Sequence, residues 1–128
     1  MDALTTHNIT VRVTAQYLPK QSNPRARRFL FGYYISIENG SQHTVQLLGR
    51  RWVITNAGGE VRVVEGPGVV GQQPVLAPGD AHQYASYCEM DTEVGAMVGT
   101  YLMQRTDTGE LFEVRIPRFL LVTPAKMN

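Results

Sequence analysis

The sequence predicts an all-β domain, in which two antiparallel sheets of about seven to eight strands pack as a sandwich. Apolar and polar residues alternate along most of the chain, and a period of two places them on opposite faces of an extended strand. Turn residues such as Gly, Pro and Asn separate the alternating segments. Apolar residues do not recur at helical spacing over ten or more residues, so no substantial helix is expected.

The first two strands have the clearest alternation. Ile9 to Tyr17 carries its apolar residues at odd positions, and Phe29 to Ile37 repeats the pattern before Asn39-Gly40. An Asn-Gly pair tolerates the positive φ of a tight turn. Six further strands are predicted by the same criterion, at residues 44–48, 51–55, 61–65, 81–88, 96–106 and 111–116.

A sandwich is favoured over a single sheet, because one sheet of this size would leave an apolar face in water. Tyr84 follows Pro78-Gly79-Asp80 just inside a strand, with Ser86 two residues later. This spacing is typical of a tyrosine corner, in which the hydroxyl bonds back to the upstream chain. The interpretation is therefore an immunoglobulin or fibronectin type III-like sandwich.

Length and composition indicate one domain spanning residues 1–128, with a core from about 8 to 122. The 128 residues carry a net charge of +1, so charge alone does not indicate a nucleic-acid surface. One cysteine, Cys88, excludes an intrachain disulfide and favours a reducing, cytoplasmic location. No apolar run approaches the ~20 residues of a membrane helix, so no membrane partner is expected.

A glycine-rich loop, Gly66-Pro67-Gly68-Val69-Val70-Gly71, matches the GxGxxG pattern of dinucleotide-binding sites. Such a loop binds pyrophosphate when a helix follows it, but Pro74 and Pro78 interrupt any such helix here. Three interpretations stay open: a structural turn, an anion nest assisted by Arg50, Arg51 or Arg62, or a peptide-binding loop.

Two arginine clusters, Arg25-x-Arg27-Arg28 and Arg50-Arg51, raise the question of nucleic acid binding. The second cluster adjoins Trp52, the only tryptophan. Arginines interleaved with an aromatic ring can bind phosphate and stack a base, but two clusters are few for this purpose. Nucleic acid is not the expected partner, and Trp52 is predicted to be a core residue.

Candidate metal ligands are Glu89, Asp91 and Glu93, which would face one side of an extended segment. The alternative is a solvated hairpin tip, because no histidine lies nearby. No cofactor is expected. Neither Cys88, whose acidic neighbours raise a thiol pKa, nor the three scattered histidines form a catalytic arrangement. The protein is therefore not expected to be an enzyme.

Five ordered motifs give a more specific indication. They are Arg50 to Thr55, Gly66-x-Gly68-Val69-Val70-Gly71-x-Gln73-Pro74, Leu76-x-Pro78-Gly79, Gly95-x-Met97-x-Gly99-x-Tyr101 and Phe112-x-Val114-x-Ile116-Pro117-x-Phe119. Together they resemble the bacterial ApaG family over nearly the whole chain. The resemblance implies a fibronectin type III-like sandwich, an association with cobalt and magnesium homeostasis, and a role in protein interaction. Gln72 departs from the charged residue often expected there.

Two functional hypotheses follow. The first is a non-enzymatic binding module that recognises a protein through a loop face or a sheet edge, where a homodimer is also conceivable. The second is a sensor that binds a polyphosphate or nucleotide, with Mg²⁺ in some cases, at Gly66–Gly71 and Arg50-Arg51.

Overall fold

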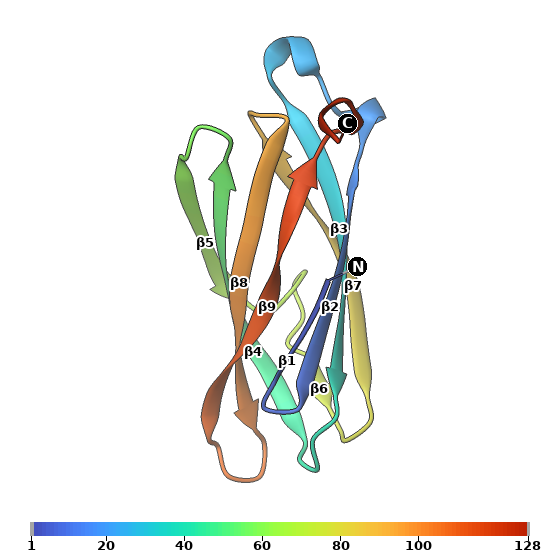
Figure 1. Ribbon diagram of the computed structural model, residues 1–128. Helices are drawn as coiled ribbons and strands as arrows, with labels where there is room; N and C mark the ends of the chain where they lie inside the picture. The colour runs from blue at the N-terminus through green and yellow to red at the C-terminus, as the bar shows by residue number, and fades with distance from the viewer. Residues whose placement is uncertain (1, 128) are drawn as a thin grey trace.

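The computed structural model describes residues 2–127, which form two antiparallel sheets packed face to face (Figure 1). The first sheet has the order β1 (Asp2–Thr6), β2 (Ile9–Tyr17), β3 (Phe29–Asn39) and β7 (Ala81–Met90). The second has the order β5 (Val61–Pro67), β4 (Val45–Asn56), β8 (Val94–Arg105) and β9 (Leu111–Val122). The two-residue β6 (Val75–Leu76) pairs with the start of β4. The predicted all-β sandwich is confirmed.

Helical structure within residues 2–127 is limited to three single turns of 3-10 helix. These are η1 (Pro19–Gln21), η2 (Pro24–Ala26) and η3 (Pro124–Lys126), each of which begins with proline. The prediction of no substantial helix is confirmed for this part of the chain. Among the described residues, no helix has the length and apolar character needed to cross a bilayer.

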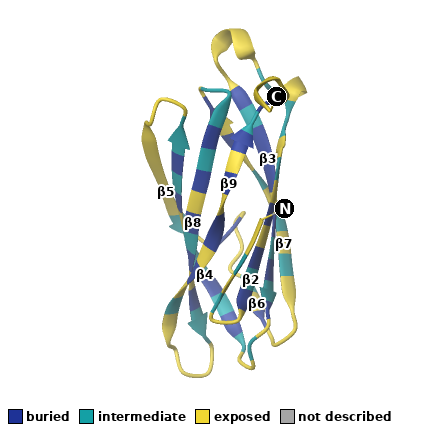
Figure 2. Ribbon diagram, in the orientation of Figure 1, coloured by how far each residue is buried: buried dark blue, intermediate teal, exposed yellow. Residues whose placement is uncertain are grey.

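The core lies between the sheets, and buried residues alternate with more exposed ones along most of the strands (Figure 2). Tyr101 and Phe31 are the largest of the fully buried side chains. Trp52 is 3% exposed and packs edge-on against the rings of Tyr33 and Phe119. Its predicted place in the core is confirmed, and aromatic contacts of this geometry add to the free energy gained from burial.

Sequence alternation does not predict two of the strands. β1 is mostly exposed, so its residues show no clear apolar face. β6 has only two residues and lies between Pro74 and Pro78. Residues 44–48 and 51–55, predicted as separate strands, instead belong to the continuous β4, which contains a register shift between Leu47 and Gly49.

One lateral edge of the sandwich is closed by the hairpin of β1 and β2. His7 and Asn8 connect these strands with positive φ angles of 50° and 65°, the geometry of a tight hairpin turn. Both strands pack beside β9 of the other sheet. The Arg115 amide donates to Thr6 Oγ1 at 3.2 Å, and the His7 ring contacts that of Phe112 edge-on. His7 therefore lies in an ordered hairpin turn and not in a frayed chain terminus.

The opposite lateral edge is open. β5 and β7 are the outermost strands there, one in each sheet, and no strand pairing joins them within residues 2–127. Figure 2 shows β5 as exposed along nearly its whole length. Most of the residues singled out by sequence patterns lie at this open edge.

Candidate functional site: the open edge between β5 and β7

A β-bulge determines which arginine enters the sandwich. Val45 and Leu47 of β4 point inward, and simple alternation would continue with residues 49, 51 and 53. The register shift after Leu47 adds one residue to β4, so that Arg50 and Trp52 take the inward positions instead. Bulges commonly re-aim side chains in this way.

Arg50 holds the glycine-rich loop from inside. Its Nη1 donates to the carbonyl oxygens of Pro67 and Gly68 at 3.1 and 3.0 Å. A Cβ at Gly66 would lie 2.9 Å from the same nitrogen, so this position leaves no room for a side chain while Arg50 keeps its place. The structure therefore brings together Arg50, Gly66 and Gly68, as the anion-nest interpretation of the sequence requires.

The rest of the loop is a tight turn. Val69 and Gln72 exchange backbone hydrogen bonds at 2.8 and 2.9 Å, and Val70 and Gly71 between them have φ angles of 47° and 75°. The Gly68 amide donates to Leu48 O. Three loop amides are thus already bound to carbonyl oxygens and do not converge on an external anion in this conformation. β6 follows the loop instead of a helix, as the prolines predict.

Arg51, by contrast, lies on the other face of the sheet. Its Nε is 2.9 Å from Glu65 Oε1, in an ion pair whose side chains are both more than half exposed. Arg50 and Arg51 are adjacent in sequence but point in opposite directions, so they do not form one site.

Tyrosine hydroxyls lie between the sheets beside Arg50. Tyr84 of β7 and Tyr101 of β8 share a hydrogen bond across the sandwich, and Tyr33 of β3 lies opposite Ser86 of β7 in the ladder. The predicted tyrosine corner is wrong in this respect, because the Tyr84 hydroxyl bonds to a side chain of the opposite sheet and not to the upstream backbone. Tyr84 lies within the edge strand β7, directly opposite Ile35 of β3.

Burial raises the pKa of all three tyrosines. Desolvation disfavours the phenolate in each case and is the largest cause, while the nearby Arg50 charge acts in the opposite direction. The pKa of Tyr101, the most deeply buried, is raised well above its ordinary value. These hydroxyls are therefore neutral at physiological pH, and they leave the positive charge of Arg50 uncompensated.

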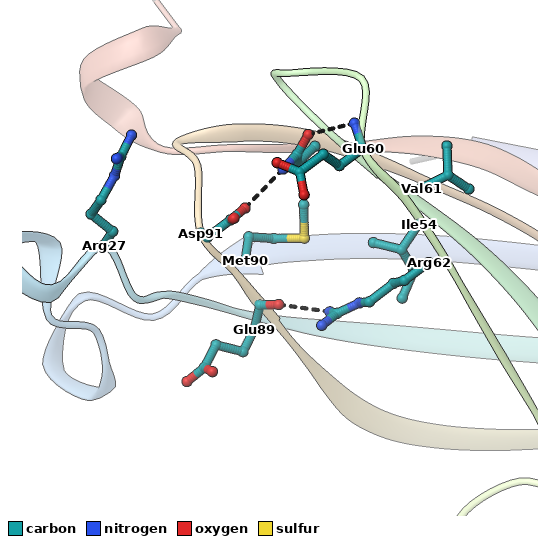
Figure 3. A pocket seen from close by; sticks show the side chains of 9 residues that line it. Arg27, Ile54, Glu60, Val61, Arg62, Glu89, Met90 and Asp91 are labelled. Carbon is teal, nitrogen blue, oxygen red and sulfur yellow. Dashed lines mark hydrogen bonds between the residues drawn. The ribbon is translucent and has the colours of Figure 1, made fainter.

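Arg62 of β5 spans the open edge. Its Nη2 donates to the Glu89 carbonyl oxygen at 2.7 Å (Figure 3). The same nitrogen approaches Cys88 Sγ at 3.4 Å. Cys88 is 4% exposed, and burial raises the pKa of its thiol, with Arg62 opposing that shift. The Arg62 side chain thus links β5 to β7, two strands that belong to different sheets.

The three acidic candidates do not converge. Glu89 pairs with Arg28 at 3.0 Å, Asp91 accepts from Asn56 Nδ2 at 3.0 Å, and Glu93 lies 3.6 Å from Lys126. The chain turns after Met90, whereas the prediction of one shared side assumed an extended segment. Within residues 2–127, no three His, Cys, Asp or Glu side chains are grouped as metal ligands.

β5 presents an apolar surface that sequence patterns did not identify as a site. Val61, Val63 and Val64 are 60%, 49% and 38% exposed. Val63 lies opposite Val53 of β4, which in turn lies opposite the exposed Val98 of β8. The signal in the sequence is the adjacent pair Val63-Val64, because two neighbouring apolar residues cannot both face one core.

Comparison with known proteins identifies the family. The ApaG domain profile matches residues 19–105, more than half of the chain. The chain belongs to the ApaG family. The resemblance based on the five sequence motifs is thereby confirmed, and the match includes the bulge of β4, the glycine-rich loop and the tyrosines of the open edge.

Individual relatives of the ApaG family match almost end to end. The chain is 51% identical over 119 residues to Protein ApaG of Rhodospirillum centenum, covering 93% of this chain and 91% of the relative. It is 52% identical to Protein ApaG of Brucella anthropi, with the same coverage. A crystal structure of an ApaA protein from Bordetella pertussis, 42% identical, superposes with a TM-score of 0.88 over 94% of this chain and 98% of that chain. The fold is thus shared with a solved relative.

Proposed function

We propose that this domain is a non-enzymatic, cytoplasmic binding module that captures an extended segment of a protein partner along β5. The observation that carries the proposal is the exposure of β5, an edge strand with three exposed valines. An unpaired edge offers backbone donors and acceptors to an added strand, and alternate side-chain contacts supply selectivity.

The surface beside β5 supports the same proposal. Val53 and Val98 continue the apolar character of Val63 across β4 and β8 on the outer face of the sheet. The ion pair of Arg51 and Glu65 lies on this face and would border the contact. An apolar centre with a polar rim is typical of protein interfaces.

The association of the family with cobalt and magnesium would, in this proposal, act through the partner. The acidic residues near β7 are engaged in three separate contacts, which supports an indirect role over a cation site formed by these side chains.

The proposal is tested by lysine substitutions that block a sheet edge. Tagged wild-type protein, the Val61→Lys/Val63→Lys double variant and the Val75→Lys control are used to capture partners after cross-linking. Val75 is a valine with 54% exposure on β6, so Val75→Lys matches each single substitution in charge and surface, and adds one positive charge where the double variant adds two. We expect a partner retained by wild type and Val75→Lys and lost from the double variant. Equal capture by all three would contradict the proposal.

Binding along β5 is then measured directly. Backbone amide shifts of the labelled protein are followed during titration with the purified partner, and the largest changes are expected in residues 61–67. Sedimentation velocity of the protein alone shows whether the partner is a second copy of this chain.

The nucleotide alternative at Gly66–Gly71 has a separate test. ATP, GTP and pyrophosphate are titrated with and without Mg²⁺ and Co²⁺, and shifts confined to this loop and Arg50 would favour a sensor. The engagement of the Gly68, Val69 and Gln72 amides favours no shift.

A further inference from the structure

A cavity of about 320 Å³ lies at the open edge, between β5 of one sheet and β7 of the other. It is lined on one side by Arg50 and Arg62, and on the other by Ser86 and Cys88 of β7. An apolar part of the wall is formed by Trp52, Ile54, Val64 and Met97, and Tyr33, Tyr87 and Glu89 complete the lining. The cavity therefore combines positive charge with an aromatic and aliphatic surface.

The two arginines of this cavity have no carboxylate partner within residues 2–127. The five ion pairs found there join other residues. Arg50 uses Nη1 for two carbonyl oxygens, and Arg62 uses Nη2 for one carbonyl and a sulfur. Their other nitrogen donors have no acceptor in this part of the chain. Glu89, the acid at the cavity's mouth, pairs with Arg28 instead.

This arrangement favours an anion. A charge that is partly removed from water is stabilised by a counter-charge, and the attraction is stronger in a low-dielectric cavity than at the surface. The nearby hydroxyls of Tyr33, Tyr84 and Tyr101 do not supply that charge. Arg50 is half-buried and Arg62 is exposed at the mouth of the cavity, so two guanidinium groups without a carboxylate partner leave a positive potential at the open edge.

We propose that this cavity binds a small organic carboxylate, whose charge is met by Arg50 and Arg62 and whose apolar body lies against Trp52. The planar guanidinium fork matches a carboxylate. The volume is at the lower end of the range for ligand pockets, roughly 300–1,000 Å³, and so suits a ligand smaller than a nucleotide. The site lies on the inward side of β5, whereas Val61 and Val63 of the proposed partner surface lie on its outward side, and Val64 belongs to both.

Benzoate is the first probe, because it combines a carboxylate with a flat apolar body. Trp52 is the only tryptophan, so its fluorescence reports directly on the cavity wall. We expect a saturable change with benzoate, and binding at least about tenfold weaker with neutral benzamide, as the loss of a charge-assisted hydrogen bond implies. Equal binding of benzamide, or no saturable change at ~50 mM benzoate, about tenfold beyond a millimolar-range Kd, would overturn the proposal.

Arginine variants locate the binding site. Arg62→Met and Arg50→Met are each expected to weaken benzoate binding about tenfold or more. Arg51→Met is the matched control and should leave the Kd unchanged, because Arg51 is paired with Glu65 on the opposite face. Unchanged binding in Arg62→Met would contradict the assignment of the cavity.

Two further measurements separate the outcomes. Arg50 also holds the glycine-rich loop, so the Arg50→Met variant can lose its fold. In that case, benzoate binding by Arg62→Met and Ser86→Val decides the result. Benzoate is expected to shift the backbone amide signals of β5 and β7. Inorganic phosphate is titrated in parallel. Binding of phosphate more tightly than benzoate would overturn the carboxylate assignment in favour of a phosphoryl group.

Discussion

The two lateral edges of the sandwich differ in how the sheets meet. At the closed edge, β1 and β2 pack beside β9, and Thr6 accepts a hydrogen bond from the Arg115 amide. At the open edge, β5 and β7 are not paired with each other, and Arg62 reaches from β5 to the carbonyl of Glu89. The closed edge is built from strands packed against each other, whereas β5 and β7 at the open edge are linked through the side chain of Arg62.

The difference separates stability from recognition. Ile9, Val11 and Val13 at the closed edge are at most 1% exposed, so this side contributes to the hydrophobic core. The open edge contains the exposed valines of β5, the inward Arg50 and the cavity. Exposed apolar surface and unpaired charge contribute little to folding, and we infer that they are available for binding.

The largest expected effect is at the closed edge. Ile9→Ala removes a fully buried side chain and leaves a cavity, so the free energy of unfolding should fall by about 2–5 kcal/mol. The matched change at the open edge, Val63→Ala, should cost less than about 0.5 kcal/mol because the side chain is 49% exposed. Urea denaturation measures both, and similar losses would contradict the comparison.

Alkaline pH should destabilise the open side through its buried tyrosines. Their folded pKa values are raised, so the stability they contribute is intact below the unfolded pKa, near 10, and is lost as the pH rises toward the folded values. Each such group lowers the free energy of unfolding by up to about 1.4 kcal/mol per pH unit in that window.

This pH dependence is measured by thermal unfolding between pH 8 and roughly pH 12, a range that spans the window above the tyrosine reference pKa. Tyr84→Phe removes one ionisable group and should make the alkaline decline shallower. Tyr34→Phe, a change at a tyrosine that is 57% exposed on the outer surface, is the control and should leave the slope as in wild type. An identical slope in Tyr84→Phe would count against the role of burial.

Arg62 provides a smaller and more local effect. Arg62→Met removes its hydrogen bond to the Glu89 carbonyl, worth about 1 kcal/mol. Hydrogen exchange of β5 amides should accelerate about fivefold, since opening of this strand becomes easier by that amount. Amides of β9 are the internal reference, and equal acceleration there would indicate global destabilisation instead of local opening.

The smallest effect is expected from the ion pair on the outer face. Arg51 and Glu65 join β4 to β5, but both side chains are more than half exposed. A double-mutant cycle with Arg51→Met and Glu65→Gln should give a coupling below about 0.5 kcal/mol that disappears at high salt. A larger, salt-resistant coupling would mean that the open edge is stabilised more strongly than the comparison implies.

Strand alternation predicted the sheets well because one face of most strands is buried. The strand Ile9–Tyr17 was predicted with the same bounds that the structure shows, and Trp52 was correctly predicted to lie in the core. Alternation fails for β1, whose side chains mostly face solvent, and it gives no bounds for the two-residue β6. Family motifs, in contrast, identified the family itself.

The candidate site was less predictable, since its geometry depends on departures from regular strands. Arg50 and Arg51 are equivalent in the sequence, and only the bulge after Leu47 determines that Arg50 faces inward. Arg62 was considered only as a residue that could assist an anion nest, and its bridging role was missed because it arises from the distance between two edge strands that are far apart in sequence. Glu89 and Asp91 were grouped on the assumption of an extended chain that in fact turns.

The exposed β5 strand also has a consequence for colloidal behaviour. An edge rich in valine can template pairing between copies, and many proteins limit this by placing lysine or proline there. β5 has no lysine, its charged residues are Arg62 and Glu65, and its proline stands at the last position. Without an occupant, this strand is therefore the segment from which concentration-dependent aggregation should begin, and soluble yield should rise whenever a bound segment covers it.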